Sequence, residues 1–153
     1  MTPPTLTDLQ QAGLTELEEI FAQEDCSSVP GGCYRGVHLL RLRTSGARVV
    51  SNRLMGLIGF ELIPFGVDFD ARCWFFFHPR LRVGRFEPRI APSRWRLTTA
   101  VTLNYEVSRL PGPVRSFLYD EVKPLSQSLC LGIGGINADR GQGDHFFFAL
   151  TRI

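Results

Sequence analysis

The chain has 153 residues, of which 44% are hydrophobic and 21% are charged, and its formal net charge is +2. This balance predicts one globular domain and excludes a disordered, collagen-like or coiled-coil chain. The longest apolar stretch, Leu54–Phe65, spans 12 residues and contains Glu61. A membrane helix needs roughly 20 apolar residues, so we expect no membrane span. The 12 Phe, 15 Gly and 10 Pro favour short strands and tight turns over a helical bundle.

Charge is distributed unevenly along the chain. Residues 1–34 carry six acids and no Lys or Arg, so all 17 cations follow residue 34, where there are nine acids. The densest basic stretch, Arg80–Arg96, holds six Arg and one acid, Glu87. Its arginines alternate with apolar residues, as on strands with one solvated face. We therefore do not expect a nucleic-acid partner, and we keep a protein-binding role for this arginine-rich face as an alternative function.

The four cysteines are Cys26, Cys33, Cys73 and Cys130. Residues 1–16 lack the cationic and apolar segments of an export signal, so we expect reduced thiols and a cytoplasmic location. The spacing Cys26-x6-Cys33, with His38 five residues later, differs from the short C-x2-4-C pattern of zinc sites. We expect neither a metal site nor a cofactor.

Residues 7–23 predict an N-terminal helical segment, which Gly13 can divide into two short helices. Thr7 with Gln10, and Thr15 with Glu18, fit the capping pattern of a helix start. The apolar residues near one helical face are Leu9, Leu17, Ile20 and Phe21. The run Ser27–Gly32 breaks regular structure. We expect a helical segment and linker over residues 1–31 and a barrel domain over residues 32–153.

From Cys33 onward, the hydrophobic pattern has a period of two, which predicts strands. The longest alternation covers Arg94–Ser108, and Leu129–Ile136 pairs with His145–Arg152 as a terminal hairpin. The pattern gives roughly seven to nine strands and neither an internal repeat nor a strand–helix–strand alternation. An antiparallel barrel or sandwich satisfies this pattern.

Two resemblances support a barrel. Gly32-Cys33-Tyr34 and Arg152 resemble the Gly-x-Trp opening of the first strand, and the cation near the last strand, of lipocalin-like barrels, with Tyr34 in place of Trp. A second resemblance is to a group of small, mostly uncharacterised proteins with a G-x-W-x-G motif. The matching segments are Gly32–Gly36, Leu54–Ile58, Pro64–Phe69, Leu131-Gly132 and Phe147–Arg152. These resemblances imply a mainly β fold, an antiparallel lipocalin-like β-barrel preceded by the helical segment, and no settled activity.

Small antiparallel barrels either fill with side chains or hold one small ligand at their mouth. If Tyr34 and Arg152 face inward, the period of two also places His38, Phe146 and Phe148 inside. We expect a hydrophobic small molecule, such as a lipid, polyketide or terpenoid, in an aromatic-lined cavity. The predicted ligand-binding residues are Tyr34, Trp74, Phe76, Leu103, Phe146, Phe148 and Arg152. The alternative is a barrel packed solid by its own aromatic rings.

The candidate catalytic residues are His38, His78 and Tyr105. Two histidines in one cavity could transfer a proton near neutral pH, and Tyr105 could polarise a ligand carbonyl. The alternative function is therefore a cofactor-independent cyclase or isomerase that folds an apolar substrate into a reactive shape. Asp120 and Glu121 are adjacent, so on a strand they face opposite sides and cannot both serve one site. The sequence leaves open whether the protein is a monomer or a homodimer.

Overall fold

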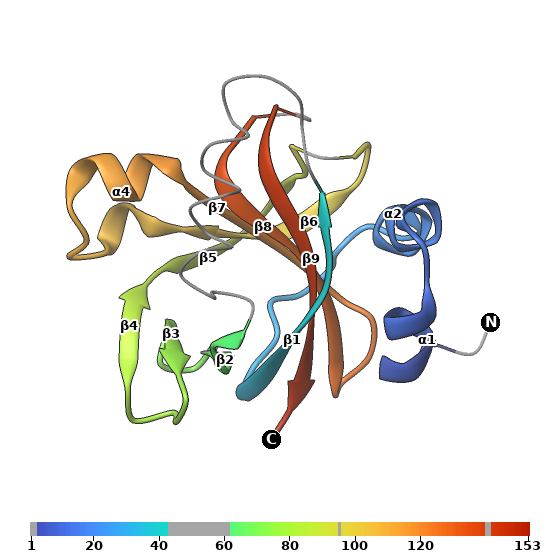
Figure 1. The fold of residues 1–153 in the computed structure, drawn as a ribbon, viewed down its shortest axis with the longest axis horizontal. Helices are drawn as coiled ribbons and strands as arrows, with labels where there is room; N and C mark the ends of the chain where they lie inside the picture. The colour runs from blue at the N-terminus through green and yellow to red at the C-terminus, as the bar shows by residue number, and fades with distance from the viewer. Residues whose placement is uncertain (1–2, 43–61, 95, 140–141) are drawn as a thin grey trace.

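The alternating segments form a nine-stranded antiparallel sheet that curls into a nearly closed barrel (Figure 1), within the part of the chain that this computed structural model describes. That part comprises residues 3–42, 62–94, 96–139 and 142–153. The segment Leu54–Ile58, which contributed to the second resemblance, and Glu61 lie outside the described residues. The expected mainly β barrel with an N-terminal helical segment is confirmed.

The spatial order of the strands is β4-β3-β2-β1-β9-β8-β7-β6-β5, with antiparallel pairing throughout. Their bounds are β1 Cys33–Leu42, β2 Phe65–Asp68, β3 Cys73–Phe76, β4 Arg82–Arg85, β5 Glu87–Pro92, β6 Thr99–Asn104, β7 Leu118–Pro124, β8 Leu129–Asp139 and β9 Gln142–Arg152. The terminal hairpin is β8–β9, in which Leu129 pairs with Thr151.

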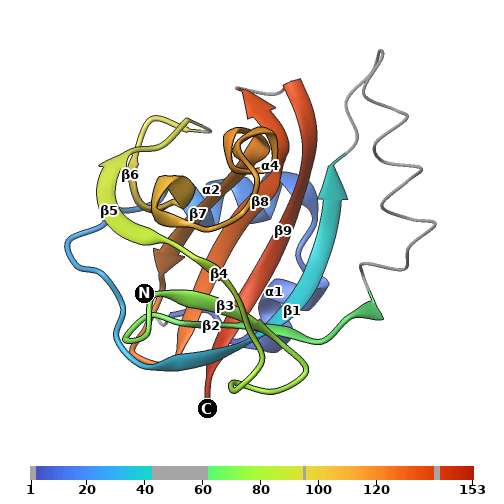
Figure 2. The same cartoon turned by 90° about the vertical axis from the view of Figure 1, so that its left-hand side faces the viewer.

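The barrel closes at β4 and β5, the two edge strands of the sheet. A single residue, Phe86, separates them in the chain, and Figure 2 shows the continuous path from β4 into β5. The Phe86 N–H donates to the Arg72 carbonyl at 3.0 Å, and the Phe86 ring is buried in the core. In the described sheet the chain itself, rather than a hydrogen-bond ladder, therefore joins these two edges. The 3-10 helix η2, Tyr105–Val107, contacts both edge strands.

Two short helices, α1 (Leu6–Gln11) and α2 (Leu14–Ala22), pack outside the barrel. Gly13 separates them as expected, but the predicted caps are wrong. The Thr5 side chain accepts from the Asp8 N–H in a capping box, and α2 has no side-chain cap.

The alternation along the strands divides the buried side chains between two cores. On β9, Phe148 and Leu150 face the barrel interior, whereas Phe147 and Ala149 face the helices. The interior core comprises Tyr34, Phe65, Val67, Phe69, Phe86, Val101, Leu103, Tyr105, Val122, Cys130, Phe148 and Leu150. The outer core comprises Leu9, Leu17, Phe21, Ala100, Leu129, Leu131, Ile133, Phe147 and Ala149. Strand alternation thus supplies both cores from the same sheet.

The structure differs from the prediction of one long strand over Arg94–Ser108. The strand begins at Thr99, and its far end becomes η2, where the Asn104 side chain accepts from the Glu106 N–H. The Ser93 hydroxyl and the Arg94 N–H donate to the Glu121 carboxylate. The Arg94 N–H is therefore bonded to a side chain distant in the sequence rather than to the backbone of a neighbouring strand. A further helix, α4 (Gly112–Phe117), precedes β7. No helix within the described residues has the length and apolar character to cross a membrane.

Candidate functional site

A cavity of about 170 Å³ lies inside the barrel. Its lining residues are His38, Phe65, Trp74, Phe76, Val83, Gly84, Tyr105, Leu110, Leu118, Asp120, Gly135 and Phe146. An apolar cavity of roughly 150 Å³ holds a benzene molecule, whereas drug-sized ligands occupy roughly 300–1,000 Å³. The cavity therefore has room for one ring-sized group.

Aromatic rings form one wall of this cavity and hold one another in place. The His38 ring lies 4.6 Å from the Phe65 ring and 5.4 Å from the Phe146 ring, between centroids. The Phe65 and Trp74 rings are 5.7 Å apart. Gly36 allows this packing, because a Cβ there would lie 2.0 Å from the Phe65 ring. Tilted and edge-on contacts of this kind fix ring orientation, so the wall is preformed.

A carboxyl group, Asp120, faces the apolar wall. Asp120 lies on β7 opposite Gly134 of β8, where a Cβ would come within 2.1 Å of Asp120 Oδ1. The absence of a side chain at Gly134 therefore makes space for the carboxyl group. Burial raises the pKa of Asp120 to about 7, although the hydrogen bond from Tyr105 acts to lower it. Near neutral pH the carboxyl group exists in both forms and can accept or donate a proton.

Two further side chains form a directed hydrogen-bond chain that ends on Asp120. The Trp74 indole N–H donates to the Tyr105 hydroxyl oxygen at 2.5 Å, and the Tyr105 hydroxyl donates to Asp120 Oδ2. Burial and the adjacent carboxylate raise the pKa of Tyr105 well above its ordinary value, so this phenol stays protonated. Among the described residues, Tyr105 is the hydrogen-bond partner of Asp120.

The structure brings half of the predicted site residues together at this cavity. They are His38, Trp74, Phe76, Tyr105 and Phe146. Leu103 and Phe148 lie in the packed interior core. The barrel interior is therefore partly filled by its own side chains and partly open.

Three predicted site residues lie away from the cavity. The Tyr34 hydroxyl donates to the Gln127 carbonyl at 3.2 Å, and Arg152 pairs with Tyr34 in the β1–β9 ladder beside Gly32. His78 is exposed in the turn after β3, where its Nδ1 accepts from the Arg80 N–H at 3.2 Å. His78 follows Trp74 and Phe76 at intervals of two and would share their face if the strand continued. The turn at Phe77 ends the alternation, so His78 lies on the surface.

Sequence reasoning missed Asp120 as a site residue, although the alternation contained the signal. Leu118 and Val122 flank Asp120 at intervals of two and share its inward face. An acid at an inward position of a barrel strand indicates either a compensated buried charge or a functional group. Its neighbour Glu121 faces outward and is enclosed by the turn at Ser93.

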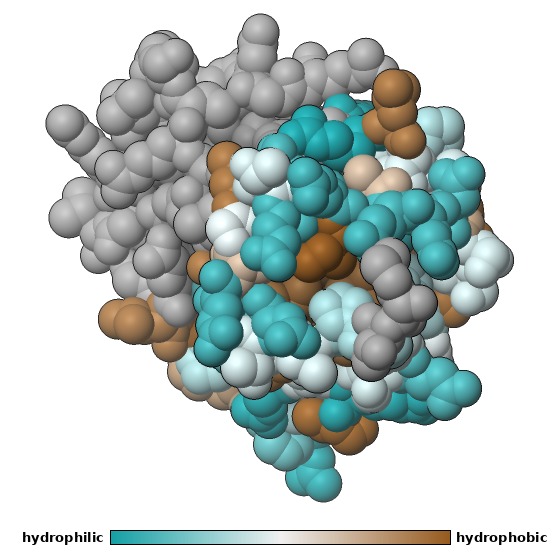
Figure 3. Space-filling view, turned by 90° about the vertical axis from the view of Figure 1, so that its right-hand side faces the viewer, coloured by the Kyte–Doolittle hydropathy of each residue, from teal (hydrophilic) through white to brown (hydrophobic). Residues whose placement is uncertain are grey.

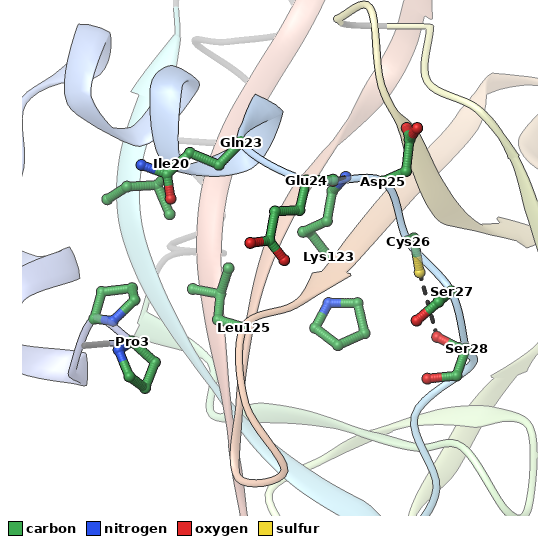
Figure 4. Close-up of a pocket in the computed structure, with 12 residues that line it drawn as sticks. Pro3, Ile20, Gln23, Glu24, Asp25, Cys26, Ser27, Ser28, Lys123 and Leu125 are labelled. Carbon is green, nitrogen blue, oxygen red and sulfur yellow. Dashed lines mark hydrogen bonds between the residues drawn. The ribbon is translucent and has the colours of Figure 1, made fainter. Parts of the chain in front are cut away.

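A second hollow, of about 530 Å³, lies outside the barrel between the N-terminal helices, the linker and β7 (Figure 4). Figure 3 faces this side of the molecule and shows hydrophobic residues exposed among hydrophilic ones. The hollow itself has a mixed lining that includes Ile20, Glu24 and Lys123. The Lys123 ammonium group donates to Thr98 Oγ1 at 2.7 Å, to the Thr99 carbonyl at 2.5 Å and to the Glu24 carbonyl. Burial lowers the pKa of Lys123. These bonds use all three of its protons to tie the linker to the barrel, which is a structural role.

The described residues show no grouping of three or more His, Cys, Asp or Glu side chains that could hold a metal ion. Cys26, Cys33, Cys73 and Cys130 are free thiols. Burial raises the pKa of Cys130 to about 12, so this thiol is not a reactive thiolate. The carboxyl, phenol and imidazole groups that line the cavity belong to Asp120, Tyr105 and His38.

Comparisons with known proteins leave the chain without an assigned family. No protein-family model and no curated protein matches it. A solved structure described as a crystal structure of a protein from Thermomonospora curvata is similar, with a TM-score of 0.49 and 17% sequence identity, covering 93% of this chain and 88% of that chain. The nearly closed nine-stranded antiparallel barrel fits a lipocalin-like fold. The resemblance to the G-x-W-x-G group gains no support from these comparisons.

Proposed function

We propose that the protein binds a hydrophobic small molecule by enclosing one ring-sized group of that molecule in the barrel cavity. The observation that carries this proposal is a preformed apolar cavity whose wall includes a buried carboxyl–phenol pair, Asp120 and Tyr105. Lipids, polyketides and terpenoids all contain groups of this size. A molecule longer than one ring would leave the rest of its length outside the cavity.

The size of the cavity limits the affinity that apolar contact supplies. Burying a ring with roughly 150–250 Å² of surface contributes about 4–6 kcal/mol at about 25 cal/mol per Å², before the costs of association. Such a contribution alone gives weak binding. The ligand therefore gains from a polar atom near Asp120, either a hydroxyl that donates to the carboxylate or a carbonyl that accepts from the protonated acid.

A cavity-blocking variant tests the binding proposal. Val83 lines the cavity and is 47% exposed, so Val83→Trp can obstruct it without disturbing the core, and Val107→Trp is the matched control at 53% exposure outside the lining. Ligand-observed NMR with phenol and 2-cyclohexenone is expected to show saturable binding that Val83→Trp weakens at least tenfold and Val107→Trp leaves unchanged. Absence of saturable binding by the unmodified protein would contradict the proposal.

A second candidate function, a cofactor-independent isomerase or cyclase, is favoured by the placement of Asp120. Its carboxylate can remove a proton from the carbon beside a ligand carbonyl and return that proton to another carbon, so the step needs no oxidant or reductant. Once Asp120 is protonated, the Tyr105 hydroxyl is free to donate to the enolate oxygen instead. His38 lines the same cavity and remains a candidate for positioning the carbonyl group.

Proton exchange distinguishes catalysis from binding. In D2O, the protein is expected to accelerate deuterium incorporation beside the carbonyl of 2-cyclohexenone, with a rate that rises as Asp120 ionises near pH 7. Asp120→Asn should slow exchange by roughly 100-fold or more, whereas Glu106→Gln, at an exposed carboxylate beside Tyr105, should not. Retained binding without exchange would support a carrier and reject the enzyme.

A further inference from the structure

The hairpin formed by β3 and β4 exposes an unusual amount of apolar surface. Phe77 is 61% exposed, Leu81 55% and Val83 47%. Ten large apolar side chains of the described residues are exposed, and these three fall within seven consecutive positions. The hairpin turn lies at the lower left edge of the molecule in Figure 1. We refer to residues 77–83 as the hairpin tip.

The hairpin tip has a defined backbone rather than a loose one. The Leu81 N–H donates to the His78 carbonyl at 2.8 Å, and the Phe76 N–H donates to the Leu81 carbonyl at 3.1 Å. The Phe77 N–H donates to the Pro64 carbonyl at 2.8 Å, which ties the tip to the residue before β2. Phe77 has a φ of +60°, a conformation that bulky residues rarely adopt. The fold therefore holds an exposed phenyl ring in a strained conformation that a glycine would satisfy at lower cost.

Cationic residues alternate with the apolar residues along the hairpin. The segment from Ala71 to Phe86 contains four Arg and no Asp or Glu. These four arginines, all exposed, are Arg72, Arg80, Arg82 and Arg85. One neighbouring acid, Asp68, lies 3.7 Å from Arg82, so the hairpin keeps a net positive charge. A hairpin that exposes both apolar and cationic side chains is complementary to a surface with an anionic outside and an apolar inside.

The same hairpin also forms part of the wall of the interior cavity. Phe76, Val83 and Gly84 line the cavity, whereas Phe77 and Leu81 point to solvent. A surface that receives the hairpin tip would therefore lie next to the cavity.

We propose that the β3–β4 hairpin is a docking element for anionic phospholipid membranes, in which Phe77 and Leu81 enter the headgroup region and the arginines contact lipid phosphates. A nucleic acid would satisfy the arginines but would leave Leu81 and Val83 without an apolar environment. The proposal depends on the hairpin alone and holds whether or not the cavity binds a ligand.

Vesicle sedimentation tests the docking proposal on the full chain. The protein is expected to sediment with vesicles of phosphatidylcholine and phosphatidylglycerol in roughly a 7:3 ratio, to bind pure phosphatidylcholine at least tenfold more weakly, and to dissociate as salt is raised. Phe77→Gly combined with Leu81→Ser should weaken binding at least tenfold. Glycine suits the backbone at position 77, so the fold is expected to tolerate this change.

Matched controls separate the hairpin from general surface properties. Leu97→Ser removes an exposed leucine outside the hairpin, and Arg89→Gln removes a cation from β5, so neither should change vesicle binding. Arg80→Gln with Arg85→Gln should weaken binding to anionic vesicles. The proposal is overturned if the unmodified protein does not sediment with anionic vesicles, or if the hairpin and control variants bind equally. A shift of RNA mobility without vesicle binding would also overturn it, in favour of a nucleic-acid surface.

Discussion

Two neighbouring carboxylates on β7 are both buried and have different surroundings. Glu121 faces outward, where it accepts from the Ser93 hydroxyl at 2.5 Å and from the Arg94 N–H at 2.7 Å. Asp120 faces inward, accepts from Tyr105, and borders a cavity. Burial raises the pKa of both groups, and hydrogen bonds act against that rise in each case, one from Tyr105 at Asp120 and two from Ser93 and Arg94 at Glu121. A buried carboxylate whose oxygens accept hydrogen bonds from the surrounding protein stabilises the fold, whereas a buried carboxyl group beside a cavity can react with a bound molecule.

The largest effect expected from this comparison is on stability at Glu121. Glu121→Ala leaves the Ser93 hydroxyl and the Arg94 N–H without their acceptor, so the free energy of unfolding should fall by about 3–5 kcal/mol. Urea denaturation measures this change. Glu106→Ala, at an exposed carboxylate, is the control and should stay within about 0.5 kcal/mol. Equal effects at the two positions would remove the structural role of Glu121.

The second effect is on the pH dependence of stability, through Asp120. Folding raises the pKa of Asp120 to about 7, so between about pH 4 and pH 7 the native state holds a proton that the unfolded state has lost. This contribution to stability is full below about pH 4 and decreases by about 3–4 kcal/mol as the pH rises to about 7. Asp120→Asn should remove that slope in denaturation curves recorded across this range. Parallel pH profiles for the two proteins would contradict the raised pKa.

A smaller effect is expected at Gly134, which makes space for the Asp120 carboxyl group. A Cβ at Gly134 would lie 2.1 Å from Asp120 Oδ1 and 3.1 Å from the Phe146 ring, so Gly134→Ala should cost about 1–3 kcal/mol. The cost should shrink in an Asp120→Ala background, which a double-mutant cycle measures. Gly13→Ala is the control, because nothing lies within 4 Å of its added Cβ. An undiminished cost in the double mutant would assign the effect to Phe146 instead.

The smallest effect is expected at Tyr105. Tyr105→Phe removes the hydrogen bond to Asp120 and the acceptor of the Trp74 indole N–H, and should lower stability by about 1–2 kcal/mol. Because that hydrogen bond lowers the pKa of Asp120, its loss should raise this pKa above its value of about 7 in the unmodified protein. An NMR titration of the Asp120 carboxyl carbon measures the change. A fall in this pKa would show that Tyr105 stabilises the protonated acid.

The sequence predicted the parts of this protein that depend on local alternation. The period of two gave the barrel, the terminal hairpin and the inward faces of β1 and β9, on which His38 and Phe146 lie. It did not predict the strand boundary at Thr99, because that boundary depends on Glu121, which accepts from Ser93 and Arg94 across 28 and 27 positions of the chain. Long-range contacts of this kind leave no periodic trace.

The sequence predicted an aromatic-lined cavity but left open whether the barrel interior is open or filled. Its existence depends on which inward side chains meet, and on glycines such as Gly134 whose missing side chains leave space. The alternation indicated that Asp120 and Glu121 face opposite sides of a strand, but it was not used to decide which of the two faces inward. The position of His78 depended on the turn at Phe77, where an uncommon backbone conformation ends the alternation.

The joint at Phe86 has a mechanical consequence. In a β-barrel whose strands are all paired on both sides, widening the interior requires breaking a row of interstrand hydrogen bonds. In the described sheet, no hydrogen-bond ladder joins β4 to β5, and the buried Phe86 and the 3-10 helix η2 hold these two edges together instead. Val83 and Gly84 of β4 border the chamber at this joint. The wall of the cavity is therefore closed at this point by a chain connection and side-chain packing, whereas the neighbouring strands are held by rows of interstrand hydrogen bonds.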